Sequence, residues 1–340
     1  MATIALTGLL NPETYFPSVL LLLLAAVPLV TSNSYVLHFL ILILFYAVLS
    51  EAWNILAGFT GQFSLGHAAF FGIGAYTSTL LFIHYGTSPW LGMLIAGVFS
   101  VACSLIIGSL CFRLRGPFFS MITIAFAEAL RLLTLNWAGL TGGAVGLLVP
   151  LMGDSAVNFQ FLSRQPYYYV LMGILLALLL TTYVIRNSQT GLYFMATRED
   201  ENAARSLGVN IFRYKLLALA ISVFFTAVAG TFYAQYILFL HPDSVMSLNF
   251  SIEIALPAII GGMGTIWGPI VGSVMLTPVS ELIRSILGGS YAGVYLIIHG
   301  SILILVVIYF PNGVTCRLAK HYQAFLRTLP GGREQEHAGN

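Results

Sequence analysis

Few side chains in this sequence could take part in acid–base, nucleophilic or metal chemistry. Asp, Glu, Lys and Arg together make up 8% of its 340 residues, and the sequence contains three cysteines. Cys103, Cys111 and Cys316 lack the spacing of disulfide frameworks or zinc sites, so we expect them to be small packing residues. No set of metal ligands, catalytic nucleophile with its base, or nucleic-acid-binding patch stands out. We therefore expect no metal, no cofactor and no enzymatic reaction in this chain.

Two acid–base pairs occur inside long apolar stretches. Glu128 and Arg131 are three residues apart, as are Glu281 and Arg284, which places the members of each pair on one face of a helix. Pairing lowers the cost of placing charge at membrane depth. We interpret both as intramembrane ion pairs with a structural role.

Two glycine-rich stretches interrupt the apolar sequence and contain polar side chains. They are AGFTGQFSLGHAAFFGIGAY at residues 57–76 and IGGMGTIWGPIVGS at residues 260–273. Lipid cannot satisfy open backbone groups, so broken helices in membranes occur where protein buries them or where they line a wet cavity, as in transporters. We predict a translocation pathway here, formed by Thr60, Gly61, Gln62, Ser64, Gly66, His67, Gly261, Gly262 and Gly264.

Close helix packing through small residues is the alternative for any one of these glycines. The polar residues that accompany the first stretch favour a pathway, although His67 alone would not decide between the two interpretations. The spacings Gly58-x-x-Gly61 and Gly261-x-x-Gly264 also hint at an internal repeat.

The densest charge in the sequence lies in TREDENAARSLGVNIFRYK, residues 197–215, and we call residues 196–212 the charged segment. Thr197 is a residue type that caps helix N-termini, and Asp200 follows it as in a capping box. Gly208 suits the left-handed position just past a helix end. The pattern predicts one short exposed helix of about ten residues.

Small side chains on this predicted helix would let a partner protein approach closely. Ala203 and Ala204 provide that room, and Leu207 adds an apolar contact. An ordinary solvated loop helix, with no partner, is the alternative.

The composition places the chain in the membrane class. Hydrophobic residues make up 58% of it, the mean hydropathy is +0.91 and the formal net charge is +2, so it has too little charge to cover a soluble surface. No Lys or Arg precedes Arg113, so the apolar residues 17–30 lack the basic flank of a signal peptide. We expect them to form a retained first helix.

A bilayer core of about 30 Å requires about 20 apolar residues in a helix. On this basis we expect an all-α fold, a polytopic transmembrane helical bundle with about ten crossings, several of them short or broken. The expected crossings are residues 18–31, 35–57, 67–84, 91–112, 117–137, 168–186, 215–238, 252–260, 269–287 and 293–310.

Basic residues predict the orientation. Alternating crossings leave Arg164 in a loop on one side, and place on the other side Arg113, Arg115, Arg186, Arg198, Arg205, Arg213, Lys215, Arg317, Lys320, Arg327 and Arg333. The positive-inside rule makes this larger group, and both termini, cytoplasmic. We expect residues 1–315 to form a transmembrane domain that includes the charged segment, and residues 316–340 a cytoplasmic tail.

Five stretches are similar to the branched-chain amino acid (high-affinity leucine/isoleucine/valine) permease family. They are the two glycine-rich stretches, RGPFFSMITIAFAEALRLL, TGGAVGL and REDENAARSLGVNIFRYKLLALAIS, and the likeness extends from about residue 50 to 313. Within the charged segment, Glu201-x-Ala-Ala-x-x-x-Gly208 resembles the coupling loop of importer-type ABC permeases.

The resemblance implies one of two homologous permease subunits of an ATP-driven importer in the bacterial inner membrane. It also implies a periplasmic solute-binding protein and two cytoplasmic ATPase subunits, which would dock on Thr197, Glu201, Ala203, Ala204, Leu207 and Gly208. The sequence contains no phosphate-binding G-x-x-x-x-G-K-[ST] motif. We therefore expect separate subunits to hydrolyse ATP.

Three alternatives stay open at this point. Relatives of the family carry urea or short amides instead of amino acids. An ion-coupled secondary transporter would use Glu51 and Glu253, which have no obvious local partner, as proton or sodium sites. A membrane-embedded enzyme is more distant, because no catalytic pair stands out.

Overall fold

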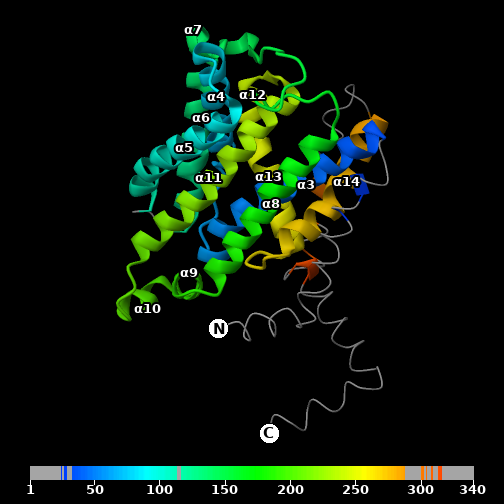
Figure 1. Cartoon of the computed structure of the whole chain (residues 1–340). Coiled ribbons are helices and arrows are strands. Elements are labelled where there is room, and N and C mark those ends of the chain that lie inside the picture. Colours follow the sequence, from blue (N-terminus) through cyan, green and yellow to red (C-terminus); the bar gives the residue numbers. More distant parts are fainter. Residues whose placement is uncertain are drawn as a thin grey trace, which may run out of the picture.

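The computed structural model describes residues 24, 27, 28, 33–112, 116–287, 300, 301, 304, 308 and 313–315. This part of the chain is almost entirely helical (Figure 1). The helices are α3 (Ser34–Thr60), α4 (His67–Tyr85), α5 (Pro89–Cys111), α6 (Pro117–Asn136), α7 (Ala138–Thr141), α8 (Gln165–Arg186), α9 (Gln189–Glu199), α10 (Glu201–Ser206), α11 (Ile211–Ile237), α12 (Pro242–Val245), α13 (Leu248–Gly261) and α14 (Gly268–Leu287).

The expected crossings between residues 35 and 287 all coincide with helices. Within the described residues, seven helical stretches are long and apolar enough to cross a membrane, with α12 and α13 counted together, and α14 contains a shorter apolar helix. Of the expected crossings at 18–31 and 293–310, the structure describes only residues 24, 27 and 28 and residues 300, 301, 304 and 308. A mostly helical bundle with seven candidate membrane spans is therefore confirmed over the described residues, whereas the number of ten crossings stays a prediction.

The bundle is built around α3. This helix packs against α8, α9, α11, α13 and α14, and every residue from 47 to 60 is buried. A helix that is apolar on all sides is expected to be enclosed by others. By contrast, α5 and α6 expose large apolar side chains, among them Leu94, Val98, Ile106, Met121 and Leu133, as a surface that faces lipid requires.

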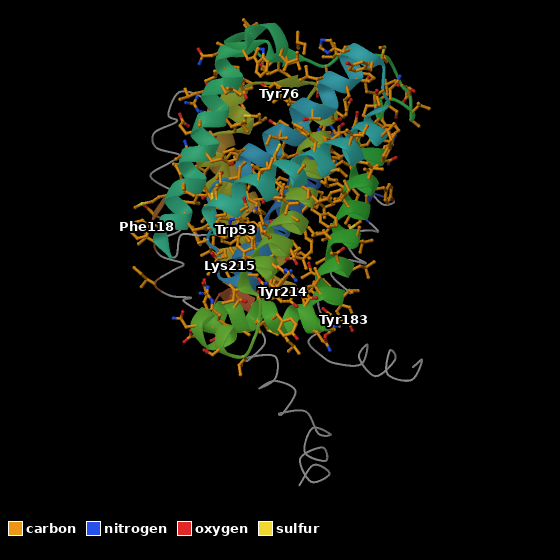
Figure 2. The ribbon with its side chains drawn as sticks, turned by 90° about the vertical axis from the view of Figure 1, so that its left-hand side faces the viewer. Trp53, Tyr76, Phe118, Tyr183, Tyr214 and Lys215 are labelled. Atoms are coloured by element: carbon orange, nitrogen blue, oxygen red, sulfur yellow. The ribbon has the colours of Figure 1, made fainter. Side chains whose placement is uncertain are left out.

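Glycine allows α4 and α11 to pack closely. A Cβ atom at Gly230 would overlap the backbone of Phe71, and one at Gly74 would overlap the backbone of Ala227. Small residues bring helix backbones together in this way in membrane proteins. Figure 2 shows Tyr76 near one end of the bundle and Lys215 toward the other, with Phe118 pointing outward.

Each glycine-rich stretch is a turn between two helices. Residues 61–66, the first connection, join α3 to α4, and residues 262–267, the second connection, join α13 to α14. Both lie toward the end of the bundle that carries α9 and α10 (Figure 1). Gly61 ends α3 with a φ of 71°, and its N–H donates to Ala57 O, the left-handed geometry that reverses a chain after a helix. The expected breaks inside helices are thus turns between successive helices.

The opposite end of the bundle is closed by α7, α12 and a small antiparallel ladder. Strand β1 (Leu147–Leu148) pairs with β2 (Phe239–Leu240) just after α11. The loop that follows β1 is anchored by Phe159, which is fully buried and packs against Trp90. At this end of the bundle, the connecting segments are therefore held by strand pairing and by a buried aromatic side chain.

Candidate functional site

The charged segment forms two helices where the sequence predicted one. Thr197 lies in the last turn of α9, where its buried hydroxyl donates to Tyr193 O at 2.7 Å. The prediction that Thr197 caps a helix is therefore wrong, because a helix that starts after Ser188 already extends through it. Asp200 is the cap: its backbone is extended, and its carboxylate accepts from the N–H groups of Asn202 and Ala203 at 2.7 and 3.1 Å.

The two alanines of α10 face opposite surroundings. Ala204 is only 2% exposed, so the prediction that it is open to a partner is wrong. Ala203 is exposed, and Leu207 has 84% of its surface in contact with solvent. Gly208 has a φ of +85°, which confirms the predicted left-handed end. Consecutive residues of so short a helix point in different directions, and a run of small residues in the sequence does not tell which of them faces outward.

Glu201 attaches α10 to the membrane helices. Its Oε1 accepts from Lys215 Nζ of α11 at 2.5 Å and from Gln62 Nε2 of the first connection at 3.3 Å. Lys215 is 1% exposed, and its ammonium lies 5.9 Å from the centre of the Phe112 ring. Lys215 is thus a buried partner of Glu201 and not a free cytoplasmic charge.

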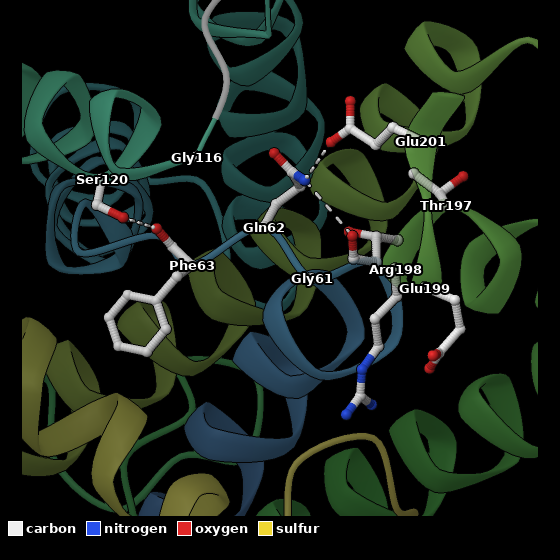
Figure 3. Close-up of a pocket in the computed structure, with 10 residues that line it drawn as sticks. Gly61, Gln62, Phe63, Gly116, Ser120, Thr197, Arg198, Glu199 and Glu201 are labelled. Atoms are coloured by element: carbon white, nitrogen blue, oxygen red, sulfur yellow. Dashed lines mark hydrogen bonds between the residues drawn. The ribbon is translucent and has the colours of Figure 1, made fainter. Parts of the chain in front are cut away.

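Arg198 attaches the end of α9 to the same region. Its Nη1 donates to Gly58 O at 2.6 Å, and its side chain extends from α9 across α3, as Figure 3 shows. A Cβ atom on Gly61 would lie 3.4 Å from Arg198 Cγ. That is an ordinary van der Waals distance, so glycine is favoured at this position by its φ of 71° and not by lack of space.

A pocket of about 510 Å³ lies between the charged segment, the first connection and the start of α6 (Figure 3). Its lining mixes charged, amide and hydroxyl groups with backbone. The lining residues are Thr60, Gly61, Gln62, Phe63, Gly116, Ser120, Thr197, Arg198, Glu199 and Glu201. Three of the predicted pathway residues (Thr60, Gly61 and Gln62) therefore share one site with two of the predicted docking residues (Thr197 and Glu201).

The polar residues predicted to line a pathway have partners inside this chain. Thr60 donates to Leu56 O at 2.6 Å. The ring of His67 lies between two hydroxyls, with Nδ1 3.2 Å from Ser64 Oγ and Nε2 2.8 Å from Ser222 Oγ. Gly66 packs directly on the backbone of Thr123. Their role along a solute path stays a prediction.

The second connection is held by a residue that the sequence did not single out. Asn54 of α3 accepts from Gly264 N–H at 2.8 Å and donates to Thr265 O at 2.9 Å. Gly261 packs on the backbone of Gly268, and Gly262 has a φ of 126°. A lone asparagine inside an apolar helix was the available signal, but nothing in the sequence identifies its partners.

The structure describes both side chains of only one of the two expected intramembrane ion pairs, Glu128 and Arg131. Arg131 Nε donates to Glu128 Oε2 at 2.9 Å, and the guanidinium also contacts Asp243 of α12, a partner far away in sequence. Glu281 lies on α14, while the side chain of Arg284 is outside the described residues.

Both acidic residues thought to lack a partner have one. Glu51 is fully buried and accepts from Asn54 Nδ2 at 3.3 Å. Glu253 accepts from the Tyr46 hydroxyl at 2.9 Å. Each carboxylate thus has a hydrogen-bond partner, while Glu51 Oε1 is buried with no partner among the described residues. Over the part of the chain that the structure describes, no group of three or more His, Cys, Asp or Glu side chains could hold a metal ion.

Comparison with known proteins identifies the family. The model of the branched-chain amino acid transport system / permease component family matches residues 35–307. The chain is 32% identical to the high-affinity branched-chain amino acid transport system permease protein LivM of Escherichia coli (strain K12), over 91% of this chain and 76% of that protein.

More distant relatives agree with this match. The permease protein LivH of Salmonella typhimurium is 25% identical over 80% of this chain and 91% of its own length. A probable LivM of Methanocaldococcus jannaschii is 23% identical over 59% of this chain and 61% of its own. No solved structure matches the chain. The extent of the family match and of the identity to LivM shows that this chain belongs to the family of permease components of branched-chain amino acid transport systems.

Proposed function

We propose that this chain is one of two membrane subunits of an ATP-driven importer that moves branched-chain or related small amino acids across the bacterial inner membrane. The relatives that it matches over most of its length are named as branched-chain amino acid permeases. The names LivM and LivH distinguish two kinds of permease component, which supports pairing with a second, homologous permease.

In this proposal, α10 is the docking element for a cytoplasmic ATPase subunit. The observation that carries it is the orientation of α10: Glu201 and Ala204 attach it to the bundle, while Ala203 and Leu207 face outward. A helix that is attached to the bundle on one side and exposed on the other can bind a partner and pass the partner's movement to the bundle. ATP would be hydrolysed in that separate subunit, since this sequence lacks the phosphate-binding motif.

The orientation follows from the distribution of basic residues. The end that carries α9 and α10 is cytoplasmic, both termini lie on that side, and the chain crosses the membrane about ten times. The end closed by α7, α12 and the β1–β2 ladder then meets the periplasmic solute-binding protein. The two connections, and the pocket beside the first of them, lie at the cytoplasmic mouth of the pathway.

Isolation of the native complex tests this function. The chain, tagged at its C-terminus and extracted from its own membranes in mild detergent, should copurify with an ATPase and a second permease. The complex should take up leucine into vesicles in an ATP-dependent way when the binding protein is added. Uptake by the chain alone, driven by a proton or sodium gradient, would contradict the proposal and favour a secondary transporter.

A further inference from the structure

The end of α3, the second connection and the charged segment touch one another at one point. Gly58 lies at this point, near the end of α3. A Cβ atom there would overlap both the Asn54 side chain and Gly264 N, so the backbones of α3 and the second connection approach to a distance that only glycine permits. Gly264, with a φ of +77°, lies in turn against the guanidinium of Arg198. Three segments that are far apart in sequence thus share one small contact.

Asn54 fastens α3 to the second connection through two backbone bonds. Its amide oxygen accepts from Gly264 N–H, and its amide nitrogen donates to Thr265 O. The nitrogen also lies 3.3 Å from Glu51 Oε2. Asn54 is fully buried, and buried amide groups are costly to leave unpaired. The three bonds therefore define one orientation of the side chain and one register of residues 264 and 265 against α3.

Arg198 fastens the charged segment to that same contact. Its bond to Gly58 O joins a charged donor to a backbone carbonyl at 2.6 Å, and such charge-assisted bonds are stronger than neutral ones. The guanidinium lies between Gly58 and Gly264, so it contacts α3 and the second connection together. The Glu201 contacts with Lys215 and Gln62 form a separate attachment, to α11 and to the first connection.

We propose that Arg198 and Asn54 are positioning residues that make the charged segment, α3, α13 and α14 move as one unit when the ATPase moves α10. This inference rests on the proposed function, since it assumes a partner that acts on α10. The inferred route begins with movement of α10. The bond from Arg198 to Gly58 O passes this movement to α3, and Asn54 passes it from α3 to the second connection. The Glu201 attachment carries the same movement to α11.

The test is transport per ATP in the assembled complex. Arg198→Gln removes the charge but keeps a side chain of similar reach, and Arg186→Gln is the matched control, because Arg186 is exposed at the end of α8 on the same side of the bundle. Each variant would be purified with its ATPase and permease partners and placed in vesicles with leucine and the binding protein. ATP hydrolysis, leucine uptake and the amount of bound ATPase would be measured on the same sample.

We expect the Arg198→Gln complex to contain normal amounts of ATPase and to hydrolyse ATP, while leucine transported per ATP falls roughly tenfold, the factor that corresponds to the loss of one charge-assisted hydrogen bond. Arg186→Gln should retain the wild-type ratio. Arg198→Lys can still donate to Gly58 O and should recover part of the loss. A merely structural role would lower the amount of complex and leave the ratio unchanged.

Two results would overturn the inference. One is a wild-type ratio in Arg198→Gln, which would show that the contact transmits nothing. The other is loss of ATPase binding in this variant, which would make Arg198 part of the docking surface. Either result leaves the proposed function intact, since that function fails when no ATPase accompanies the wild-type chain or when the chain alone takes up leucine. If Arg198→Gln does not fold, Asn54→Ser decides, because it removes the amide group that binds Gly264 and Thr265: a wild-type ratio in that variant contradicts the proposal.

Discussion

Ala203 and Ala204 are neighbours in sequence but differ completely in environment. Ala203 is on the open side of α10, while Ala204 packs against the bundle and is 2% exposed. The same substitution should therefore have two different effects at these positions. This pair offers a test of which face of α10 the partner meets.

Ala203→Glu should leave the membrane domain folded and weaken ATPase binding, because overpacking a close contact costs about 1–3 kcal/mol, or roughly a five- to hundredfold loss of affinity. Ala204→Glu should instead lower the stability of the chain itself, since it forces a carboxylate into a buried position, at a cost of about 1–3 kcal/mol. Thermal unfolding of the isolated chain and ATPase binding to it separate the two effects. Equal stability of the two variants would contradict the inward orientation of Ala204.

At the scale of elements, the packing of α4 on α11 depends on glycines that leave no room for a side chain. Gly230 lies against the backbone of Phe71, and a backbone cannot move aside as a side chain can. Gly173 is also a glycine in the middle of a helix, α8, but a Cβ atom added there would have nothing within 4 Å. The two sites form a matched pair.

Gly230→Ala should destabilise the bundle by about 1–3 kcal/mol through overpacking. Gly173→Ala should be neutral or stabilise by about 0.5–1 kcal/mol, because alanine is the better helix former. Unfolding midpoints in detergent, measured side by side, give the difference. A Gly230→Ala chain as stable as wild type would mean that α4 and α11 are packed less closely than described.

The element scale also shows what the sequence could and could not predict. Long apolar runs between polar residues placed every described membrane helix, because bilayer thickness fixes their length. The end of α10 at Gly208 was predictable from glycine's access to positive φ. Its beginning was not: Thr197 and Asp200 are both good caps, and only the presence of α9 decides between them.

The candidate site was less predictable than the helices, because its contacts join residues far apart in the chain. Asn54 and Gly264 are 210 residues apart, and Arg198 meets Gly58 across 140. The glycine motifs indicated where backbones come close. They did not indicate that each of the two connections contacts the charged segment.

For the whole molecule, sidedness can be tested directly. In a background without native cysteines, Asn202→Cys on α10 should react with an impermeant maleimide only in inverted vesicles. Val157→Cys, exposed in the loop after β1, should react only in intact spheroplasts. The reason is the segregation of basic residues to the side of α10. Labelling of Asn202→Cys in intact spheroplasts would reverse the topology.

The β1–β2 ladder has a consequence for how a soluble protein would meet the far end of the bundle. The ladder and the buried Phe159 anchor residues 147–164 to the bundle without any partner. A preorganised surface loses little conformational entropy on binding, so more of the contact energy appears as affinity. A binding protein that docks there would meet a surface that is already ordered. The affinity of a short-lived contact would then depend mainly on how well the two surfaces fit in shape.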